Sequence, residues 1–407
     1  MISRCQRTII LLLLFILTLT CGCYAGNATS IEDIFQTQLV ARDDLWSRTK
    51  FSKRGKLAKL FKSDKPKLGK AFGKSVRRRF GAIGDVHGDL ERTKSALKLS
   101  GVLNHEEVWS NTFDFFVQVG DVIDRGSDTI KLIKYLEELR SKAPKGHELF
   151  TLMGNHEFMN LQGLWEKVSP EDIKSFGGKE DRWKAISGWI GEIWEKNYIT
   201  ALWLPLHPAI GEPNNPHNVP EDSSLRQTPF FNAAYSFLHG GLSPFYGESV
   251  PFPKRINDIS KGLIIKLRSR PVGEQIHMTD DEIFLLSRYN GPLWYYGWRD
   301  HPLCEYVDRI LTQTRTRRMI VGHSLVPEIR TVCKGKVILI DTGISLAMRN
   351  SRLSALVVDY SVTHVGEKGG VTELEEKEEV KAVYSDPTKD KVLVKVARRI
   401  KVKIEKD

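Results

Sequence analysis

The sequence predicts an α/β fold in which the central strands pair in parallel. Hydrophobic residues make up 41% and charged residues 27% of the 407 residues, an ordinary composition for a globular protein. From residue 79 onward, short apolar runs alternate with segments of helical periodicity. Several of these runs end in Gly-Asp or Gly-Asn, and ligands collect at the carboxyl ends of strands in sheets of this kind.

The alternation of strand and helix is clearest in the first half of this region. The predicted elements are strands at residues 80–84, 113–119 and 149–153, with helices between them at residues 90–100 and 127–141. The strands are short apolar and aromatic runs. The intervening segments are long enough to form the crossover that parallel strands require.

The second half of the region predicts more strands and fewer helices. A Trp-rich stretch at residues 170–197 predicts helix, and the Pro- and Asn-rich stretch at 207–220 predicts a loop. Residues 391–404 alternate Val and Leu with Lys and Arg, as a half-exposed strand does. Apolar runs predict further strands at residues 234–238, 318–321, 337–340 and 355–360.

The net charge of +11 is concentrated in one segment of the chain. Residues 48–79 contain fourteen Lys and Arg and a single acidic residue, Asp64, whereas the chain from residue 80 onward is close to neutral. The body of the protein therefore has no charge pattern that predicts binding to nucleic acid. Two interpretations of the basic segment are open. It is either a solvated linker, which its glycines and Pro66 favour, or a contact with an anionic membrane surface or an acidic partner.

The N-terminus predicts entry into the secretory pathway. Arg4 and Arg7 precede an apolar run at residues 9–19, and a small residue, Ala25, marks a cleavage point, so residues 1–25 resemble a signal peptide. An uncleaved anchor is the alternative, although the run is shorter than the ~20 residues of a membrane-spanning helix. We expect an endomembrane compartment or secretion, or the periplasm in a bacterium. Asn27 would be a glycosylation site in a eukaryotic host.

The cysteines do not indicate a disulfide scaffold. Three of the five lie in the signal region, which leaves only Cys304 and Cys333. These two would form a single bridge in an oxidising compartment or stay as two buried thiols, and both interpretations are open.

Five polar clusters follow apolar runs and indicate the chemistry of the chain. Carboxylate, imidazole and amide groups together suit divalent metals of intermediate hardness. A single His is more often structural than a ligand, but five such clusters at strand ends indicate a metal site. The clusters read Gly-Asp-Val-His-Gly-Asp at residues 84–89, Gly-Asp-Val-Ile-Asp-Arg-Gly at 120–126, Gly-Asn-His-Glu at 154–157, His-Gly-Gly at 239–241 and Gly-His at 322–323.

This series of motifs resembles that of the phosphoprotein phosphatases, a group of binuclear metallophosphoesterases. Within the group it is similar to the Shewanella-like phosphatases, because residues 291–295 read Gly-Pro-Leu-Trp-Tyr and residues 341–345 read Asp-Thr-Gly-Ile-Ser. The resemblance implies the metallophosphoesterase fold, a central β-sandwich of mixed sheets flanked by helices. We expect residues 26–78 to be a basic linker, 79–365 the catalytic domain, and 366–407 an extension that is acidic and then basic and strand-like.

The resemblance also implies a role for individual residues. Two divalent metals, Mn, Fe or Zn, would share a bridging hydroxide that attacks the phosphorus atom. The implied ligands are Asp85 and His87 for the first metal, Asn155, His239 and His323 for the second, and Asp121 for both. His156 would be the general acid for the leaving oxygen, with its imidazole oriented by Asp124.

The residues that would hold the phosphate include one departure from the family pattern. Arg125 and Asn155 are the implied phosphate contacts. Relatives usually have an arginine where this chain has Tyr296, and Arg299 is the candidate to replace it. Asp89 and Glu157 are interpreted as helix caps or supporting groups rather than ligands.

We therefore expect a phosphomonoester hydrolase. The leading hypothesis is a phosphatase whose substrates are phosphorylated proteins. Phosphoserine or phosphothreonine and phosphotyrosine are both open as substrates. One alternative is a hydrolase of small phosphoesters or dinucleoside polyphosphates. Another is a pseudoenzyme that binds phosphorylated partners without turnover, which the filled ligand positions argue against and Tyr296 argues for. The sequence makes no prediction about the oligomeric state.

Overall fold

The computed structural model of the protein describes residues 75–403 except residues 222, 248, 272–273 and 275. The expected signal peptide, the sequon at Asn27 and the basic segment up to residue 74 lie outside the described residues. No helix in the described part of the chain is long and apolar enough to cross a membrane.

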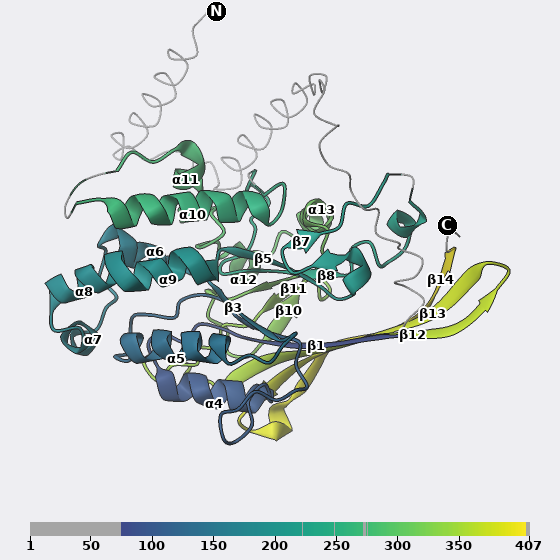
Figure 1. Cartoon of the computed structure of the whole chain (residues 1–407), viewed down its shortest axis with the longest axis horizontal. Helices are drawn as coiled ribbons and strands as arrows, with labels where there is room; N and C mark the ends of the chain where they lie inside the picture. Colours follow the sequence, from purple (N-terminus) through teal and green to yellow (C-terminus); the bar gives the residue numbers. More distant parts are fainter. Residues whose placement is uncertain (1–74, 222, 248, 272–273, 275, 404–407) are drawn as a thin grey trace, which may run out of the picture. The chain divides into compact units, whose positions relative to one another are not determined.

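Two mixed β-sheets form the centre of the described chain (Figure 1). The larger sheet contains four parallel strands, β1 (Val76–Ile83), β2 (Phe115–Gln118), β3 (Glu148–Leu152) and β4 (Tyr198–Ile199). It continues beyond β1 with three antiparallel strands, β12 (Ser354–Lys368), β13 (Val371–Tyr384) and β14 (Lys391–Lys403). The strands of the smaller sheet are β5 (Ala201–Pro205), β8 (Ala234–Leu238), β9 (Arg318–Val321), β10 (Arg330–Val332) and β11 (Val337–Leu339).

The order of the strands places β1 at the middle of the larger sheet and β9 at the middle of the smaller one. Within the described residues the larger sheet runs β14-β13-β12-β1-β2-β3-β4, and the smaller one runs β10-β11-β9-β8-β5. Aromatic side chains join the inner faces, since the ring of Phe80 lies 5.3 Å from that of Tyr235 and 6.1 Å from that of Phe237. The expected sandwich of mixed sheets is therefore confirmed.

Helices cover both outer faces of the sandwich (Figure 1). On one side, α4 (Leu90–Ser100) and α5 (Thr129–Ser141) connect β1, β2 and β3. The helices that follow β3 are α6 (Asn155–Gln162), α7 (Pro170–Ser175), α8 (Lys179–Ala185), a π-helical turn η1 (Ile186–Ile190) and α9 (Gly191–Asn197). The later helices are α10 (Lys254–Ser269), α11 (Asp280–Leu285), α12 (Gly297–Asp300) and α13 (Cys304–Thr314).

The helix α4 has the predicted bounds because both of its ends are capped. The Asp89 carboxylate accepts a hydrogen bond from the backbone N–H of Arg92 at 3.1 Å, as an N-cap residue does. Gly101 ends the helix with a φ of 82°, a left-handed conformation that glycine adopts without strain. The cap interpretation of Asp89 is thus confirmed.

Other elements differ from the predictions in extent. The predicted helix at residues 170–197 is broken, because Gly177 and Gly178 both have positive φ between α7 and α8. The predicted loop at 207–220 contains a short hairpin of β6 (Gly211–Glu212) and β7 (Asn215–Pro216). Cys304 and Cys333 form a disulfide that ties the start of α13 to the turn after β10.

The C-terminal residues continue the larger sheet. The expected boundary after residue 365 falls inside β12, and β13, which was not predicted, pairs with β12 along most of its length. The inner face of β13 carries two fully buried carboxylates, Glu376 and Glu378. Together with their partners they form a buried ionic cluster, made up of Glu376, Glu378, Arg317, Arg318, Tyr235 and Tyr360.

Candidate metal centre

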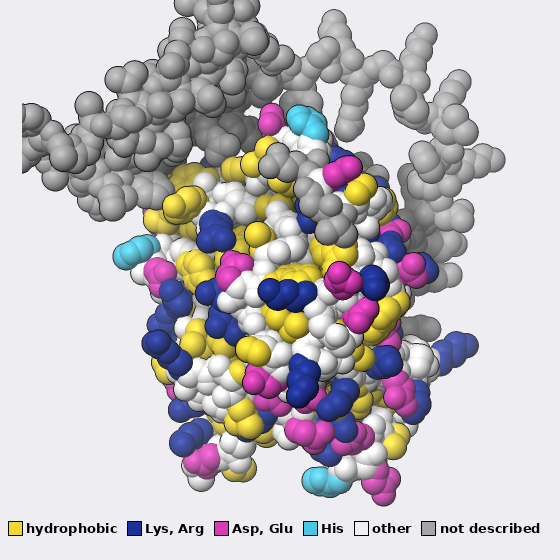
Figure 2. Space-filling model, turned by 90° about the vertical axis from the view of Figure 1, so that its left-hand side faces the viewer, with side chains coloured by type: hydrophobic (Ala, Val, Ile, Leu, Met, Phe, Trp, Pro, Cys, Tyr) yellow, Lys and Arg dark blue, Asp and Glu magenta, His cyan; other side chains and the backbone are white. Residues whose placement is uncertain are grey.

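The predicted polar clusters meet at one end of the sandwich. β1, β2 and β3 are parallel, so the segments after them reach the same edge of the sheet, and the segments after β8 and β9 join them there. A cavity of about 320 Å³ opens at this edge and is lined by Asp85, His87, Asp121, Arg125, Asn155, His156, Arg299 and His323, among others. On the face of the molecule shown in Figure 2, Lys and Arg side chains are interspersed with hydrophobic ones.

The backbone around the cavity is bent to aim these side chains inward. Positive φ angles, which residues other than glycine rarely adopt, occur at His87, Asp121, Asp124 and His323. Gly154 permits the closest approach, because a Cβ at this position would lie 2.1 Å from Asp121 Oδ1. The glycines of the motifs therefore serve the packing of the loops rather than a direct chemical step.

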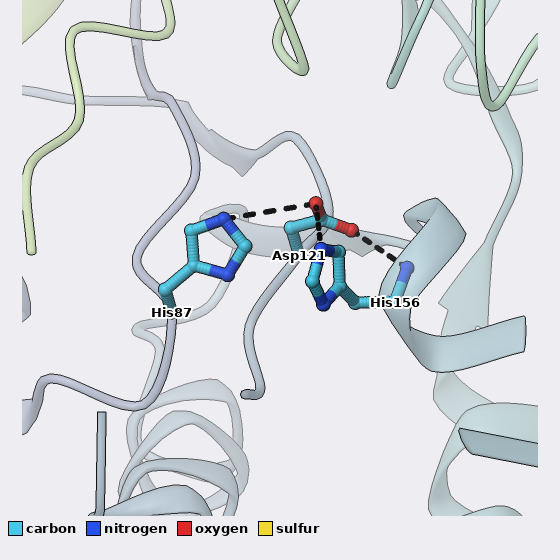
Figure 3. A group of neighbouring side chains, drawn as sticks. All are labelled: His87, Asp121 and His156. Carbon is cyan, nitrogen blue, oxygen red and sulfur yellow. Dashed lines mark hydrogen bonds and ion pairs between the residues drawn. The ribbon is translucent and has the colours of Figure 1, made fainter. Parts of the chain in front are cut away.

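Asp121 lies between two groups of histidines, and Figure 3 shows the first of them. His87 Nε2 is 3.8 Å and His156 Nε2 is 3.7 Å from Asp121 Oδ2. On the other side, His239 Nε2 is 3.3 Å from Asp121 Oδ1, and His323 completes the second group. Asp85 adjoins both groups, with Oδ2 4.0 Å from His87 Nε2 and Oδ1 3.9 Å from His239 Nδ1.

Hydrogen bonds fix which nitrogen of each histidine faces the cavity. His87 Nδ1 lies 3.0 Å from the Ile123 carbonyl, and His239 Nδ1 lies 2.8 Å from the Val119 carbonyl. Each Nε2 atom therefore points toward Asp121. A backbone partner on one ring nitrogen is the usual way in which proteins orient a metal-binding histidine.

The electrostatics of the protein without metal favour neutral imidazoles at two positions. Burial lowers the pKa of His87 to about 4, and burial together with His239 lowers the pKa of His323 well below its ordinary value. A neutral imidazole keeps the lone pair that a metal ion needs. Burial alone would also lower the pKa of His239, but Asp121 and Asp85 raise it to about 10.

Asn155 lies beside the second group of histidines. Its side-chain oxygen is 2.8 Å from His239 Nε2. Glu157, two residues after Asn155, does not face the cavity, because its carboxylate accepts backbone hydrogen bonds from Gly154, Asp121 and Val122. The supporting role expected for Glu157 is therefore confirmed.

His156, a member of the first group, also forms a buried pair with Asp124. His156 Nδ1 lies 2.7 Å from Asp124 Oδ2, which leaves Nε2 facing the cavity. Burial alone would lower the pKa of His156, but Asp121 and Asp124 outweigh burial and raise it. The imidazole thus has the environment of a group that carries a proton.

The donor atoms fit divalent metal ions. Ligands at ~2.0–2.2 Å from one ion lie about 3–3.5 Å apart, close to the spacings between Asp121 and the histidines here. His323 Nε2 is buried and has no hydrogen-bond partner in the described part of the chain, although it lies in the second group. An unpartnered buried nitrogen beside carboxylates is a lone pair that a cation would satisfy.

The Metallophos model, described as calcineurin-like phosphoesterase, matches residues 78–327 of this chain. The chain belongs to this family. Members of the family use divalent metals, and the His and Asp groups around Asp121 are groups that could hold such ions. The prediction of a metal-dependent phosphatase enzyme is thereby confirmed.

Three relatives are 27–29% identical to the chain. An uncharacterized protein of Schizosaccharomyces pombe is 29% identical over 67% of this chain and 74% of the relative. Shewanella-like protein phosphatase 2 of Arabidopsis thaliana is 28% identical over 65% of this chain and 71% of the relative. Shewanella-like protein phosphatase 1 of Plasmodium berghei is 27% identical over 65% of this chain and 67% of the relative. The resemblance to this branch of the family is confirmed.

Solved structures support the fold. The cold-active protein-tyrosine phosphatase of a psychrophilic Shewanella species aligns with a TM-score of 0.54 and 19% identity, over 78% of this chain and 80% of that chain. A mutant form of a cold-active protein tyrosine phosphatase aligns over the same shares of the two chains, with a TM-score of 0.55 and 19% identity. At this identity the likeness shows the fold alone.

All three phosphate-binding candidates, Arg125, Arg299 and Asn155, line the cavity, and Asn155 is buried beside His239. Arg125 is exposed, and its guanidinium has no ion pair within the described residues. Arg299 also lines the cavity, but its guanidinium contacts both carboxylate oxygens of Asp300, at 2.6 and 3.0 Å. The Tyr296 ring contacts both His323 and Arg299, with its centroid 4.2 Å from that of His323 and 5.1 Å from the Arg299 guanidinium carbon.

Two groups near the cavity were not assigned a role from the sequence. Asp341, in the Asp-Thr-Gly-Ile-Ser motif, is buried beside Asp85, and burial raises its pKa to about 6. Arg182 of α8 is fully buried and contacts Asp124. The motif around Asp341 was a signal that could have indicated its place, whereas nothing in the local sequence distinguishes Arg182 from a surface arginine.

Proposed function

We propose that this protein is a binuclear metal-dependent phosphomonoesterase that acts on phosphorylated proteins, with His156 as general acid. The observation that carries the proposal is the arrangement around Asp121. It lies between two groups of side chains that could bind metal, and the first group includes His156, which Asp124 holds. The names of the curated relatives, two of which are protein phosphatases, support phosphoproteins as the substrates.

The residues divide into those that would hold metal and those that would act on the substrate. Asp85 and His87 would bind one ion, Asn155, His239 and His323 the other, with Asp121 shared between them. Mn, Fe and Zn all suit this nitrogen and oxygen set. When bound, the two ions supply an activated water and neutralise charge on the phosphate oxygens.

His156 is positioned to donate a proton to the leaving oxygen. Its Nε2 faces the cavity, while the Nδ1–H is held by Asp124, which favours the protonated imidazole. Arg125 presents an unpaired guanidinium at the mouth, where its fork of donors would bind two phosphate oxygens. The two roles together would bind the phosphate and stabilise the leaving group.

The test compares a phosphotyrosine peptide, a phosphoserine peptide and a dinucleoside polyphosphate as substrates of the full chain, with and without Mn²⁺. We expect Mn²⁺-dependent turnover of at least one peptide and little of the nucleotide. The His156→Ala variant should lose about 100-fold or more in turnover of the peptides. It should retain both metal ions, measured by elemental analysis.

The metal content of the His156→Ala variant separates two roles for this residue. His156 Nε2 lies as close to Asp121 as His87 Nε2 does, so a ligand role predicts loss of one metal ion from the variant. The general-acid role predicts full metal content with impaired turnover. Absence of turnover in the wild-type chain loaded with two ions would contradict the proposed function itself.

Tyr296 provides a prediction about phosphate affinity. Because Arg299 is occupied by Asp300, Arg125 is the phosphate-binding candidate whose guanidinium has no ion pair within the described residues. Tyr296→Arg should add a second guanidinium and lower the inhibition constant of inorganic phosphate by about tenfold, the effect of one charge-assisted hydrogen bond. Tyr296→Leu is the matched control, since it removes the ring without adding a charge. Equal phosphate inhibition in all three proteins would show that position 296 does not contact the phosphate.

A further inference from the structure

Arg182 lies directly behind Asp124, on the side away from His156. Its Nη2 donates to Asp124 Oδ1 at 3.0 Å and to Asn160 Oδ1 at 2.8 Å, and its Nη1 donates to Asp172 Oδ2. The exposed fraction of Arg182 is 0%. A buried guanidinium is costly unless carboxylates surround it, so its position here is determined by Asp124 and Asp172.

Four buried groups form a chain of contacts that ends at the metal centre. His156 is followed by Asp124, Arg182 and Asp172, each in contact with the next. Without Arg182, the carboxylates of Asp124 and Asp172 would be buried without the guanidinium that lies between them.

The backbone of Asp124 is also strained, so its hydrogen-bond partners must hold the residue in this conformation. Its φ is 69°, in the left-handed region that an aspartate adopts at a cost. Asn160 Nδ2 donates to both of its oxygens at 2.9 Å, and Arg182 fixes Asn160 in turn. The Arg182 guanidinium is itself stacked on Phe176, with its central carbon 4.7 Å from the ring centroid. The carboxylate therefore has one orientation, the one that meets His156.

We propose that Arg182 is a positioning residue for the reaction: it holds Asp124 in the orientation that presents the His156 proton to the leaving oxygen. This inference rests on the proposed function, in which His156 is the general acid. The fork of the guanidinium is required, because the ammonium of a lysine is a point charge that cannot bridge Asp124, Asn160 and Asp172 in one plane.

The test uses aryl phosphates that differ in their need for a general acid. Phenyl phosphate has a poor leaving group that must be protonated, whereas dinitrophenyl phosphate leaves as a stable anion. With Mn²⁺-loaded full chain, Arg182→Met should reduce kcat for phenyl phosphate by about 100-fold, the usual contribution of a general acid, and kcat for dinitrophenyl phosphate by less than about fivefold. Arg182→Lys should show a smaller loss with the same selectivity.

Two controls separate positioning from loosened packing. Arg268 lies in the same helical layer and pairs with Glu195 of α9, but it does not contact Asp124, so Arg268→Met should reduce the turnover of both esters equally or not at all. In the Asp124→Asn background, Arg182→Met should cause no further loss, because the two residues act through one pathway.

Each outcome decides one question. If the Arg182 variants lose kcat equally for both esters, or lose none for either, the positioning role is overturned. Arg182→Lys provides this comparison if Arg182→Met does not fold. An additive loss in the Asp124→Asn background would do the same. A wild-type chain that fails to hydrolyse dinitrophenyl phosphate would refute the proposed function instead.

Discussion

Asp121→Asn should abolish the binding of both metal ions and, with it, turnover. The Asp121 carboxylate is the group shared by the two clusters, with Oδ2 facing His87 and Oδ1 facing His239. Replacing a supporting partner of a ligand usually weakens metal binding by about 10–100-fold, so loss of a ligand shared by two ions should cost at least about 100-fold at each site. Burial alone would raise the pKa of Asp121, but His239 and His156 lower it, so the carboxylate is charged at neutral pH.

The measurement is metal content together with thermal unfolding, because both report binding without requiring activity. Mn²⁺ should raise the Tm of the wild-type chain, since an ion that binds only the folded state stabilises it. The Tm of Asp121→Asn should be insensitive to Mn²⁺. Asp341→Asn is the matched control, because it removes another buried carboxylate from the same cavity but from neither group. Two ions bound to Asp121→Asn would contradict the shared-ligand assignment.

The sequence predicted where the polar clusters meet because strand order and motif position determine this together, whereas the individual ligands were implied by the resemblance to the phosphatase family. Each ligand follows an apolar run, and the carboxyl ends of β1, β2 and β3 meet at one edge whatever the details of the loops. Helix α4 was predicted to the residue since Asp89 and Gly101 cap it. Local signals of this kind need no knowledge of the distant chain.

The partners that act over long sequence separations could not be predicted in the same way. Arg182 is 58 residues from Asp124, and an arginine in a helical stretch is by default a surface residue. The strand β13 was missed for a similar reason. Its inner face carries Glu376 and Glu378 between apolar residues, so the alternation of polar and apolar residues disappears. The two carboxylates are explained by arginines from distant parts of the chain, Arg317 and Arg318 at the start of β9 and Arg398 of β14.

A substitution in the buried ionic cluster should have a large effect on the free energy of unfolding. Glu378 is buried and accepts hydrogen bonds from Tyr235, Arg317 and Arg318. Removing one partner of a buried pair leaves the other charge uncompensated and costs about 3–5 kcal/mol. Glu378→Leu should therefore lower the free energy of unfolding in urea by this amount.

Glu375→Ala is the matched control for this substitution. Glu375 lies on the outer face of the same strand, where its solvent-exposed pair with Lys377 should contribute little to stability. Adding Arg318→Met to Glu378→Leu should recover part of the loss, because the unpaired guanidinium is then removed as well. Equal stabilities of Glu378→Leu and Glu375→Ala would mean that the cluster does not hold β13 in the sheet.

The stabilising effect of Glu378 should depend on pH in a defined direction. Burial alone would raise the pKa of Glu378, but Arg317 and Arg318 outweigh burial and hold it below the ordinary value. A carboxyl whose pKa is lowered by folding stabilises the folded state above its unfolded pKa, and this contribution is lost as the pH falls through the folded pKa. The difference in unfolding free energy between wild type and Glu378→Leu should thus be largest near neutral pH and shrink in acid. Since β13 joins β12 and β12 joins β1, the strand that leads to Asp85, acid would loosen the support of the metal centre from this side.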